Sequence, residues 1–266
     1  MTDQPTEQLL PGAAGDAPAR ASRRWPRLLV RTLVPLGVLA VLLVAADAIV
    51  RSVVEQRVAA EIEKSLPETV KADVDARIGG LSVLQQLLAG RFESVDLLAP
   101  RATVGGAPLN VRVHATGVPT ELSKPIGSAT GTLSISQDSL NKLVTVPGAT
   151  GDLTLQQGAV GYDGRLDLLG LPVAYTVSAN PEAAGKKVLL RPVKASISTG
   201  TGDVNVTRLL QSLTESGPFP VCAAQYLPDG VLVRDIAAMP GRATVVLSAS
   251  RFVMGEEFLR SKGHCS

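Results

Sequence analysis

Residues 33–66 read LVPLGVLAVLLVAADAIVRSVVEQRVAAEIEKSL, and this stretch decides how the chain is organised. Its first part, Leu33–Ala46, is an almost unbroken apolar run. Five arginines precede the run: Arg20, Arg23, Arg24, Arg27 and Arg31. Positive charge before an apolar segment keeps the N-terminus in the cytoplasm and sends the following residues across the membrane. We therefore expect everything after Asp47 to be exported.

The second part of the stretch has the pattern of an amphipathic helix. Aliphatic residues recur about every four positions and so lie along one helix face. They are Ile49, Val50, Val53, Val54, Val58, Ile62 and Leu66. Charged residues are expected on the opposite face: Arg51, Glu55, Arg57, Glu61 and Lys64. One continuous helix is predicted to lead from the apolar run into the exported domain.

The apolar run fits an uncleaved anchor or a cleaved signal peptide. About 15 uncharged residues separate Arg31 from Asp47, or about 22 Å of helix, which is short of a hydrocarbon core of roughly 30 Å unless the flanks contribute. Residues 46–48, Ala-Asp-Ala, could form a cleavage site. The long N-terminal region and the continuing helical pattern favour the uncleaved anchor.

These observations predict three parts. Residues 1–27 are expected to form a disordered basic cytoplasmic tail, residues 28–50 a transmembrane signal-anchor or signal peptide, and residues 51–266 an extracytoplasmic domain on the periplasmic side. That last part is long enough for one sizeable core, so no second domain is required.

Composition excludes several classes of function. The net charge of +2 comes largely from the arginine cluster, so no basic face for nucleic acid is implied. Aromatic residues are only 3% of the chain, which argues against stacking platforms and predicts an aliphatic core.

Strand patterns dominate after Pro67. Val70–Ile78 alternates apolar and polar residues, which predicts one strand with one buried face. Residues 81–89 are predicted to form a short helix that presses Leu84, Leu87 and Leu88 on the sheet. Further strands are predicted at residues 92–97, 108–115, 132–136, 152–157, 165–169, 173–178 and 187–198, with a closing hairpin of 231–237 and 242–250.

Two more short helices are predicted, one opening at Ser136 and one at 204–213 capped by Asp203. Strands recur without alternating with long helices, which argues against a parallel doubly wound sheet. The prediction is an α+β fold with a meandering antiparallel sheet.

The chain has two cysteines, Cys222 and Cys265, both on the expected exported side. In an oxidising compartment a single pair usually forms one disulfide. The competing interpretation is a metal site of Cys222, His264 and Cys265, which lacks a second nearby histidine.

Catalytic residues are sparse. His114 lies on the polar side of a predicted strand, where a solvated residue is expected rather than a general base. Asp73 and Asp75 share a wet strand face, and no Gly-x-Ser-x-Gly motif occurs. We predict a protein that is not an enzyme and that uses no cofactor or metal.

Residues 73–97 read DVDARIGGLSVLQQLLAGRFESVDL. This segment resembles the signature of the LmeA family of exported actinobacterial phospholipid-binding proteins: a strand, a Gly-rich turn into a short Leu-rich helix, a glycine, then a second strand. The similarity covers about residues 48–250. It departs from the family's usual Phe-Pro after the glycines, where this chain has Leu81-Ser82.

The resemblance implies a relative of the tubular lipid-binding fold, in which a strongly curved antiparallel sheet wraps around a long helix and leaves an apolar channel. It also implies a membrane-tethered protein that binds a phospholipid or a lipoglycan precursor in the cell envelope. Support of lipomannan-type glycolipid synthesis follows from the family, with an envelope glycosyltransferase as a candidate partner.

A lipid cavity would be lined by the inward apolar residues of this region. The expected lining is Val74, Ile78, Leu84, Leu87, Leu88, Phe92, Leu109, Val111 and Val113. The alternative is that every apolar residue packs against another and no cavity exists, which would make the domain a structural or protein-interaction module of an envelope membrane complex. Lipid that co-purifies with the protein would distinguish the two.

Overall fold

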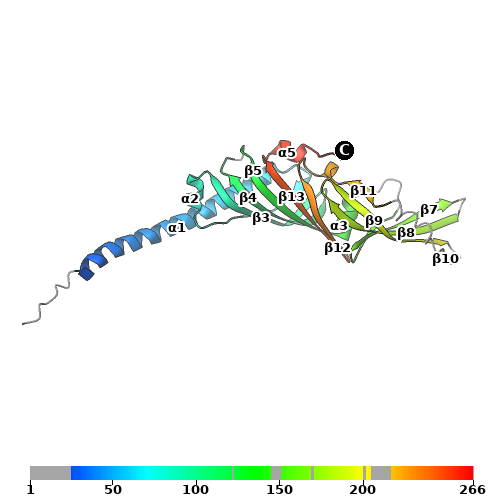
Figure 1. Cartoon of the computed structure of the whole chain (residues 1–266), viewed down its shortest axis with the longest axis horizontal. Coiled ribbons are helices and arrows are strands. Elements are labelled where there is room, and N and C mark those ends of the chain that lie inside the picture. Colours follow the sequence, from blue (N-terminus) through cyan, green and yellow to red (C-terminus); the bar gives the residue numbers. More distant parts are fainter. Residues whose placement is uncertain are drawn as a thin grey trace, which may run out of the picture. The chain divides into compact units, whose positions relative to one another are not determined.

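The computed structural model of the chain describes residues 25–121, 123–144, 151–168, 171–199, 202–204 and 217–265 (Figure 1). Met1–Ala46 and Asp47–Ser266 form two compact units. The tail predicted for residues 1–27 lies outside the described residues as far as residue 24.

Helix α1 extends from Trp25 to Ser65, so the predicted continuous helix is confirmed. Its large apolar side chains between Val30 and Val44 are all exposed, with Val44 71% exposed. Among the described residues, α1 is long and apolar enough from Val30 onward to cross a membrane. It therefore has the properties of a membrane anchor or of a signal sequence.

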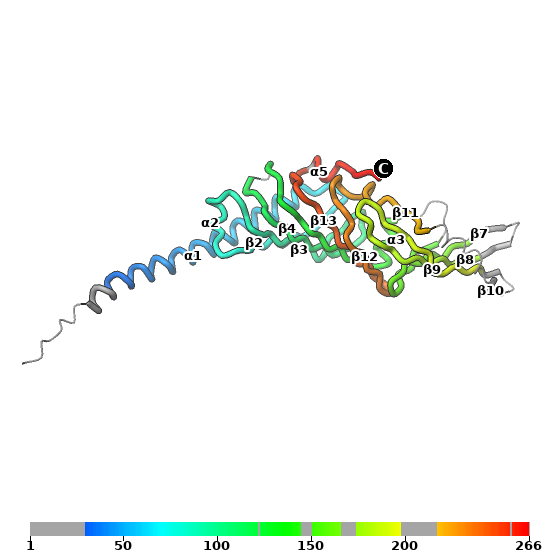
Figure 2. Tube along the Cα trace, in the orientation of Figure 1, coloured from blue at the N-terminus to red at the C-terminus, as the bar shows by residue number. Residues whose placement is uncertain are grey.

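The strands form two sheets, and every described strand pair is antiparallel. Sheet 1 contains β1 (Val70–Lys71), β2 (Asp75–Ile78), β3 (Arg91–Val104), β4 (Ala107–Pro119), β5 (Ile126–Ser136), β12 (Leu232–Met239) and β13 (Arg242–Phe252). Its order is β1-β3-β4-β5-β13-β12, and β2 also pairs with β3. Figure 2 traces how the late hairpin of β12 and β13 returns beside β5.

Sheet 2 contains β6 (Leu153–Gln156), β7 (Ala159–Leu168), β8 (Leu171–Ala184), β9 (Lys187–Thr199), β10 (Gly202–Val204) and β11 (Phe219–Cys222). Its order is β10-β9-β8-β7-β6, with β11 paired to β9. A small core of Ile135, Leu155 and Ala243 joins the two sheets. The α+β class and the closing hairpin are confirmed, whereas the expectation of a single sheet is wrong.

The short helices are α2 (Val83–Leu88), α3 (Gln137–Leu143), the 3-10 helix η1 (Ala224–Tyr226) and α5 (Glu256–Arg260). The predicted helix after Ser136 is confirmed, because the Ser136 hydroxyl accepts a hydrogen bond from the Ser139 N–H as an N-cap. Asp203 and Val204 pair with β9 instead of starting a helix. The rest of the helix predicted at 204–213 lies outside the described residues.

The strand predicted at Val70–Ile78 is two strands, β1 and β2. Its alternation is confirmed, since Val74, Ala76 and Ile78 are buried and Asp73, Asp75 and Arg77 are exposed. The interruption lies opposite Pro100 of β3, where the register shifts against β4 as well. Proline cannot donate to a ladder and is tolerated at a bulge, so Pro100 explains why the pairing breaks there.

Carboxylates of α1 bind the free main-chain N–H groups of β2 and of the residue just before it. The Ile78 N–H donates to Glu55 Oε1 at 2.8 Å, and the Val74 N–H donates to Glu63 Oε1 at 2.8 Å. From Glu55 to Glu63 the helix advances about 12 Å, and from Val74 to Ile78 the extended chain advances about 13 Å. The two carboxylates are therefore spaced like the two N–H groups that they bind. The sequence placed Glu55 on the helix face opposite the aliphatic stripe, and in the structure its carboxylate binds the main chain of the edge strand.

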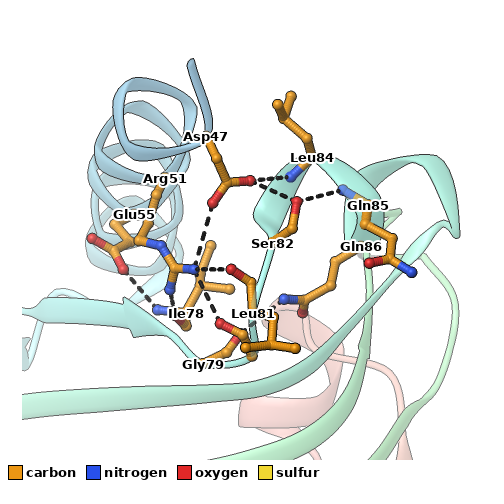
Figure 3. Close-up of polar contacts among 11 residues, drawn as sticks. Asp47, Arg51, Glu55, Ile78, Gly79, Leu81, Ser82, Leu84, Gln85 and Gln86 are labelled. Atoms are coloured by element: carbon orange, nitrogen blue, oxygen red, sulfur yellow. Dashed lines mark hydrogen bonds and ion pairs between the residues drawn. The ribbon is translucent and has the colours of Figure 1, made fainter. Parts of the chain in front are cut away.

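Arg51 and Asp47 extend the same row of contacts toward α2 (Figure 3). The Arg51 guanidinium donates to the carbonyls of Ile78 and Gly80, the latter at 3.1 Å. Asp47 Oδ1 accepts from the Ser82 hydroxyl at 2.8 Å and from the Leu84 N–H at 2.9 Å. Arg51, which the sequence also placed opposite the aliphatic stripe, therefore binds the main chain of the domain as well.

Helix α2 turns a different face to the core than predicted. Val83 and Gln86 are buried, at 0% and 5% exposure, whereas Leu88 is 92% exposed. Because the helix begins at Val83, its inward positions are 83, 86 and 87, and position 88 points outward. The prediction that Leu88 packs on the sheet is wrong.

Cys222 and Cys265 form a disulfide with a sequence separation of 43. The predicted bridge is confirmed, and it uses the thiolates that the alternative metal site would require. A disulfide is typical of an extracytoplasmic domain.

Replacing both cysteines, as Cys222→Ser with Cys265→Ser, should lower the free energy of unfolding by about 4 kcal/mol, because the closed loop restricts the unfolded chain. Denaturant unfolding of the full chain in detergent measures the change. The unmodified protein under reducing conditions should show the same loss, and an unchanged midpoint in both would contradict the prediction.

Glu55→Ala should lower the free energy of unfolding by about 1–3 kcal/mol, because the Ile78 N–H on a buried residue loses its acceptor. Thermal unfolding in the same detergent is the measurement. Arg57→Ala, at an exposed position of the same helix that does not line the cavity, is the control and should change stability by less than about 0.5 kcal/mol. Equal losses in the two variants would argue against the role of Glu55.

Candidate functional site

The inner face of sheet 1 carries two rows of side chains that cross four strands. The register aligns Val95, Ala115, Ala129 and Ala249 in one row across β3, β4, β5 and β13. It aligns Leu97, Val113, Gly131 and Leu247 in the next row. Three alanines and a glycine occupy four of these eight positions, so small side chains leave space above this part of the face.

Helix α1 contacts the same sheet on both sides of these rows. Val50 and Val54 pack on the core cluster that includes Phe92 and Ile126, and Ile62 packs on a second cluster that includes Leu109. Val58 lies between them in the apolar stripe and lines a cavity. The stripe predicted from the sequence is therefore confirmed, although Ile49 and Val53 are exposed.

The cavity between these elements has a volume of about 460 Å³. Both rows of sheet 1 form its floor, and α1 forms a wall with Val58, Glu61, Ile62 and Ser65. The segment from Phe252 to Gly255, with Phe258 of α5, covers another side. The Phe252 and Phe258 rings stack with centroids 4.8 Å apart.

The lining is almost entirely apolar. Its polar members are Glu61, Ser65, Ser123 and Ser248. A volume of this size with apolar walls and few polar groups is typical of a small-ligand site. The chemistry that it offers is burial of hydrocarbon, since an apolar surface gains free energy when it leaves water.

The nine side chains predicted to line a cavity lie in several places. Val113 lines the cavity. Ile78 and Phe92 belong to the first core cluster, with Leu87 packed against it. Val74 and Leu109 belong to the second, with Val111 packed against it. Leu84 is partly exposed on α2 and Leu88 is exposed.

The small residues of the floor were missed by the sequence analysis. Ala115, Ala129, Gly131 and Ala249 alternate with polar neighbours at the period of a strand. That alternation indicates an inward face, but the predicted lining consisted of large apolar residues, which fill a core rather than leave space. An inward face of alanine and glycine was the available signal.

His114 lies on the outer face of sheet 1 and pairs with Asp96 at 2.6 Å. Both side chains are about half exposed, at 53% and 50%, as the strand alternation predicted for His114. They lie beside Arg77 and Arg112 on a surface separate from the cavity floor. Among the described residues no cluster of three potential metal ligands occurs.

A family model, described as LmeA-like phospholipid-binding, matches residues 45–248. The match includes all eight floor positions except Ala249, and the α1 residues from Asp47 onward. No curated protein and no solved structure shows a significant match to the chain.

Gly131→Ala should be tolerated, because its methyl group would meet its nearest neighbour, Val113 Cγ2, at 3.8 Å. A strand glycine costs roughly 0.5–1 kcal/mol relative to alanine, so the free energy of unfolding should rise by about that amount. Gly127→Ala, on the same strand, is the matched contrast and should destabilise, since its methyl group would lie 2.9 Å from the Thr116 carbonyl oxygen. Unfolding in denaturant distinguishes the two, and a destabilised Gly131→Ala would contradict the open floor.

Proposed function

The chain belongs to the LmeA-like phospholipid-binding family, and on that premise we propose that it is a membrane-tethered protein that holds phospholipid acyl chains in the cavity between α1 and sheet 1. The observation that carries the proposal is the apolar cavity of about 460 Å³ over a floor of alanine, glycine and aliphatic residues. Each methylene transferred into it from water contributes about 0.8 kcal/mol. Ten methylenes would contribute about 8 kcal/mol before the costs of binding.

Sheet 1 is proposed to curve around the C-terminal part of α1, as in tubular lipid-binding domains. The contacts of Val50 and Val54 with one cluster and of Ile62 with the other support this arrangement. The cavity would then be part of an apolar channel along the helix. Val113 is the predicted lining residue that this channel includes.

Residues 28–50 are proposed as the signal-anchor, with residues 1–27 in the cytoplasm and residues 51–266 outside the membrane. The exposed apolar side chains of α1 and the disulfide support this topology. A tether keeps the cavity at high effective concentration near its lipid source. In this position the protein would support envelope lipid or lipoglycan synthesis, with a lipid or lipoglycan precursor as ligand and an envelope glycosyltransferase as partner.

The alternative is a structural or protein-interaction module without a lipid cavity. That hypothesis requires a filled interior between helix and sheet. The open floor beneath Val58 supports lipid binding over it.

Lipid retention by variants of the full chain tests the proposal. Ala129→Phe projects a ring into the cavity from β5 and should displace at least two methylenes, or about 1.6 kcal/mol, so that retained lipid falls at least about tenfold. The measurement is native mass spectrometry of detergent-purified protein, which counts phospholipid bound per chain.

Thr130→Phe is the matched control, because Thr130 neighbours Ala129 on the exposed side of the same strand. It should retain as much lipid as the unmodified protein. Thermal unfolding of both variants verifies that they fold. The proposal is wrong if folded Ala129→Phe retains the same lipid as Thr130→Phe, or if the unmodified protein retains none.

A further inference from the structure

Two leucines beside α2 are almost completely exposed. Leu81 is 98% exposed and Leu88 is 92% exposed. Leu84 is partly exposed and lies one helical turn before Leu88 on the same helix face. Three large apolar side chains within eight residues form an apolar tip, which we define as Leu81, Leu84 and Leu88.

The backbone beneath the apolar tip is fixed by hydrogen bonds. Figure 3 shows Asp47 and Arg51 of α1 reaching the turn that precedes α2. Asp47 accepts from Ser82 and Leu84, and Arg51 donates to the Gly80 carbonyl. The buried Val83 anchors the other side of α2 in the core. The leucines are therefore presented by an ordered turn, without being needed to close the core.

The residue that holds this turn is the first one after the apolar run. Asp47 directly follows Ala46, the last residue of the apolar run Leu33–Ala46, in a helix that is long and apolar enough from Val30 onward to cross a membrane. The turn that is hydrogen-bonded to Asp47 is therefore held next to the point where an anchored chain leaves the bilayer. At that point the chain passes through the lipid headgroup region.

The apolar tip also lies next to the strand ends of sheet 1 where one end of the cavity is found. At these strand ends β3 begins with Arg91, directly after the turn that follows α2, and Arg91 pairs with Pro119 at the end of β4. The Thr120 N–H donates to the Gly90 carbonyl at 3.1 Å, which joins the α2–β3 turn to the β4–β5 loop. Ser123 and Ile126 of that loop region line the cavity.

We propose that Leu81, Leu84 and Leu88 insert into the outer surface of the bilayer in which α1 is anchored. The inserted leucines would hold these strand ends of sheet 1, and the end of the cavity beside them, against the lipid. This inference rests on the proposed function, since it gives the route by which an acyl chain enters. Burial in the bilayer removes the exposed leucine surface from water. A second copy of the chain or a partner protein over the same leucines is the outcome that the experiment must exclude.

The experiment uses the full chain in phosphatidylcholine vesicles with an environment-sensitive nitrobenzoxadiazole dye on Leu88→Cys. The native cysteines are paired in the disulfide, so the dye reacts at one position. Phosphatidylcholine brominated on acyl carbons near the headgroup should strongly quench the emission. The spectrum in unbrominated vesicles should be shifted to the blue.

Met239→Cys with the same dye is the control. Met239 is a partly exposed apolar residue, 45% exposed, at the turn between β12 and β13, which is the opposite end of sheet 1. Its emission should not respond to bromine. The inference is overturned if position 88 responds no more than position 239, or if its blue shift depends on protein density and not on bromine, which would indicate contact with a second copy.

The two proposals fail separately. Loss of the difference in lipid retention between Ala129→Phe and Thr130→Phe would remove the cavity function and leave bromine quenching at position 88 intact. Normal retention behaviour together with an unquenched position 88 would preserve the cavity and overturn the insertion of the apolar tip.

Discussion

The structure of the domain that follows Ala46 depends on the match between the polar groups of α1 and the main chain of residues 74–84. Glu55 accepts from the Ile78 N–H at the end of edge strand β2, Glu63 accepts from the Val74 N–H just before that strand, and Asp47 and Arg51 bind the turn that follows. The helical rise and the strand rise give nearly equal distances over these intervals. This match fixes the position of the helix along the sheet, and it satisfies backbone groups that an uncovered edge strand would leave open.

The cavity follows from this fixed position and from the size of the side chains opposite. The apolar stripe of α1 contacts large residues at two clusters, whereas Val58 faces a floor that contains Ala115, Ala129 and Gly131. An interior normally packs to crystal-like density, and a void costs free energy because its lining loses contacts. A flexible hydrocarbon chain restores those contacts, so the same geometry that weakens the empty domain favours a lipid ligand.

The floor is completed only by the end of the chain. Leu247 and Ala249 of β13 supply one side of both rows, and they reach it through the pairing of β13 with β5. Such long-range pairing costs loop-closure entropy before its contacts form. The Cys222–Cys265 disulfide closes the segment that contains β12 and β13, and so it restricts the unfolded state of the part of the chain that completes the cavity.

The sequence by itself determined the features that depend on local periodicity and composition: the long helix with its aliphatic stripe, the antiparallel α+β class, the closing hairpin and the disulfide. It also carried the family resemblance through residues 73–97. Tertiary structure decided the rest. The division into two sheets, the bulge at Pro100 of β3 and the outward turn of Leu88 depend on register and helix phase, which a single residue can shift. The cavity depends on which small residues align across four strands, and this alignment joins residues that are far apart in the chain. For this reason Val113 was predicted, whereas Ala129, Gly131 and Ala249 were found only in the folded sheet.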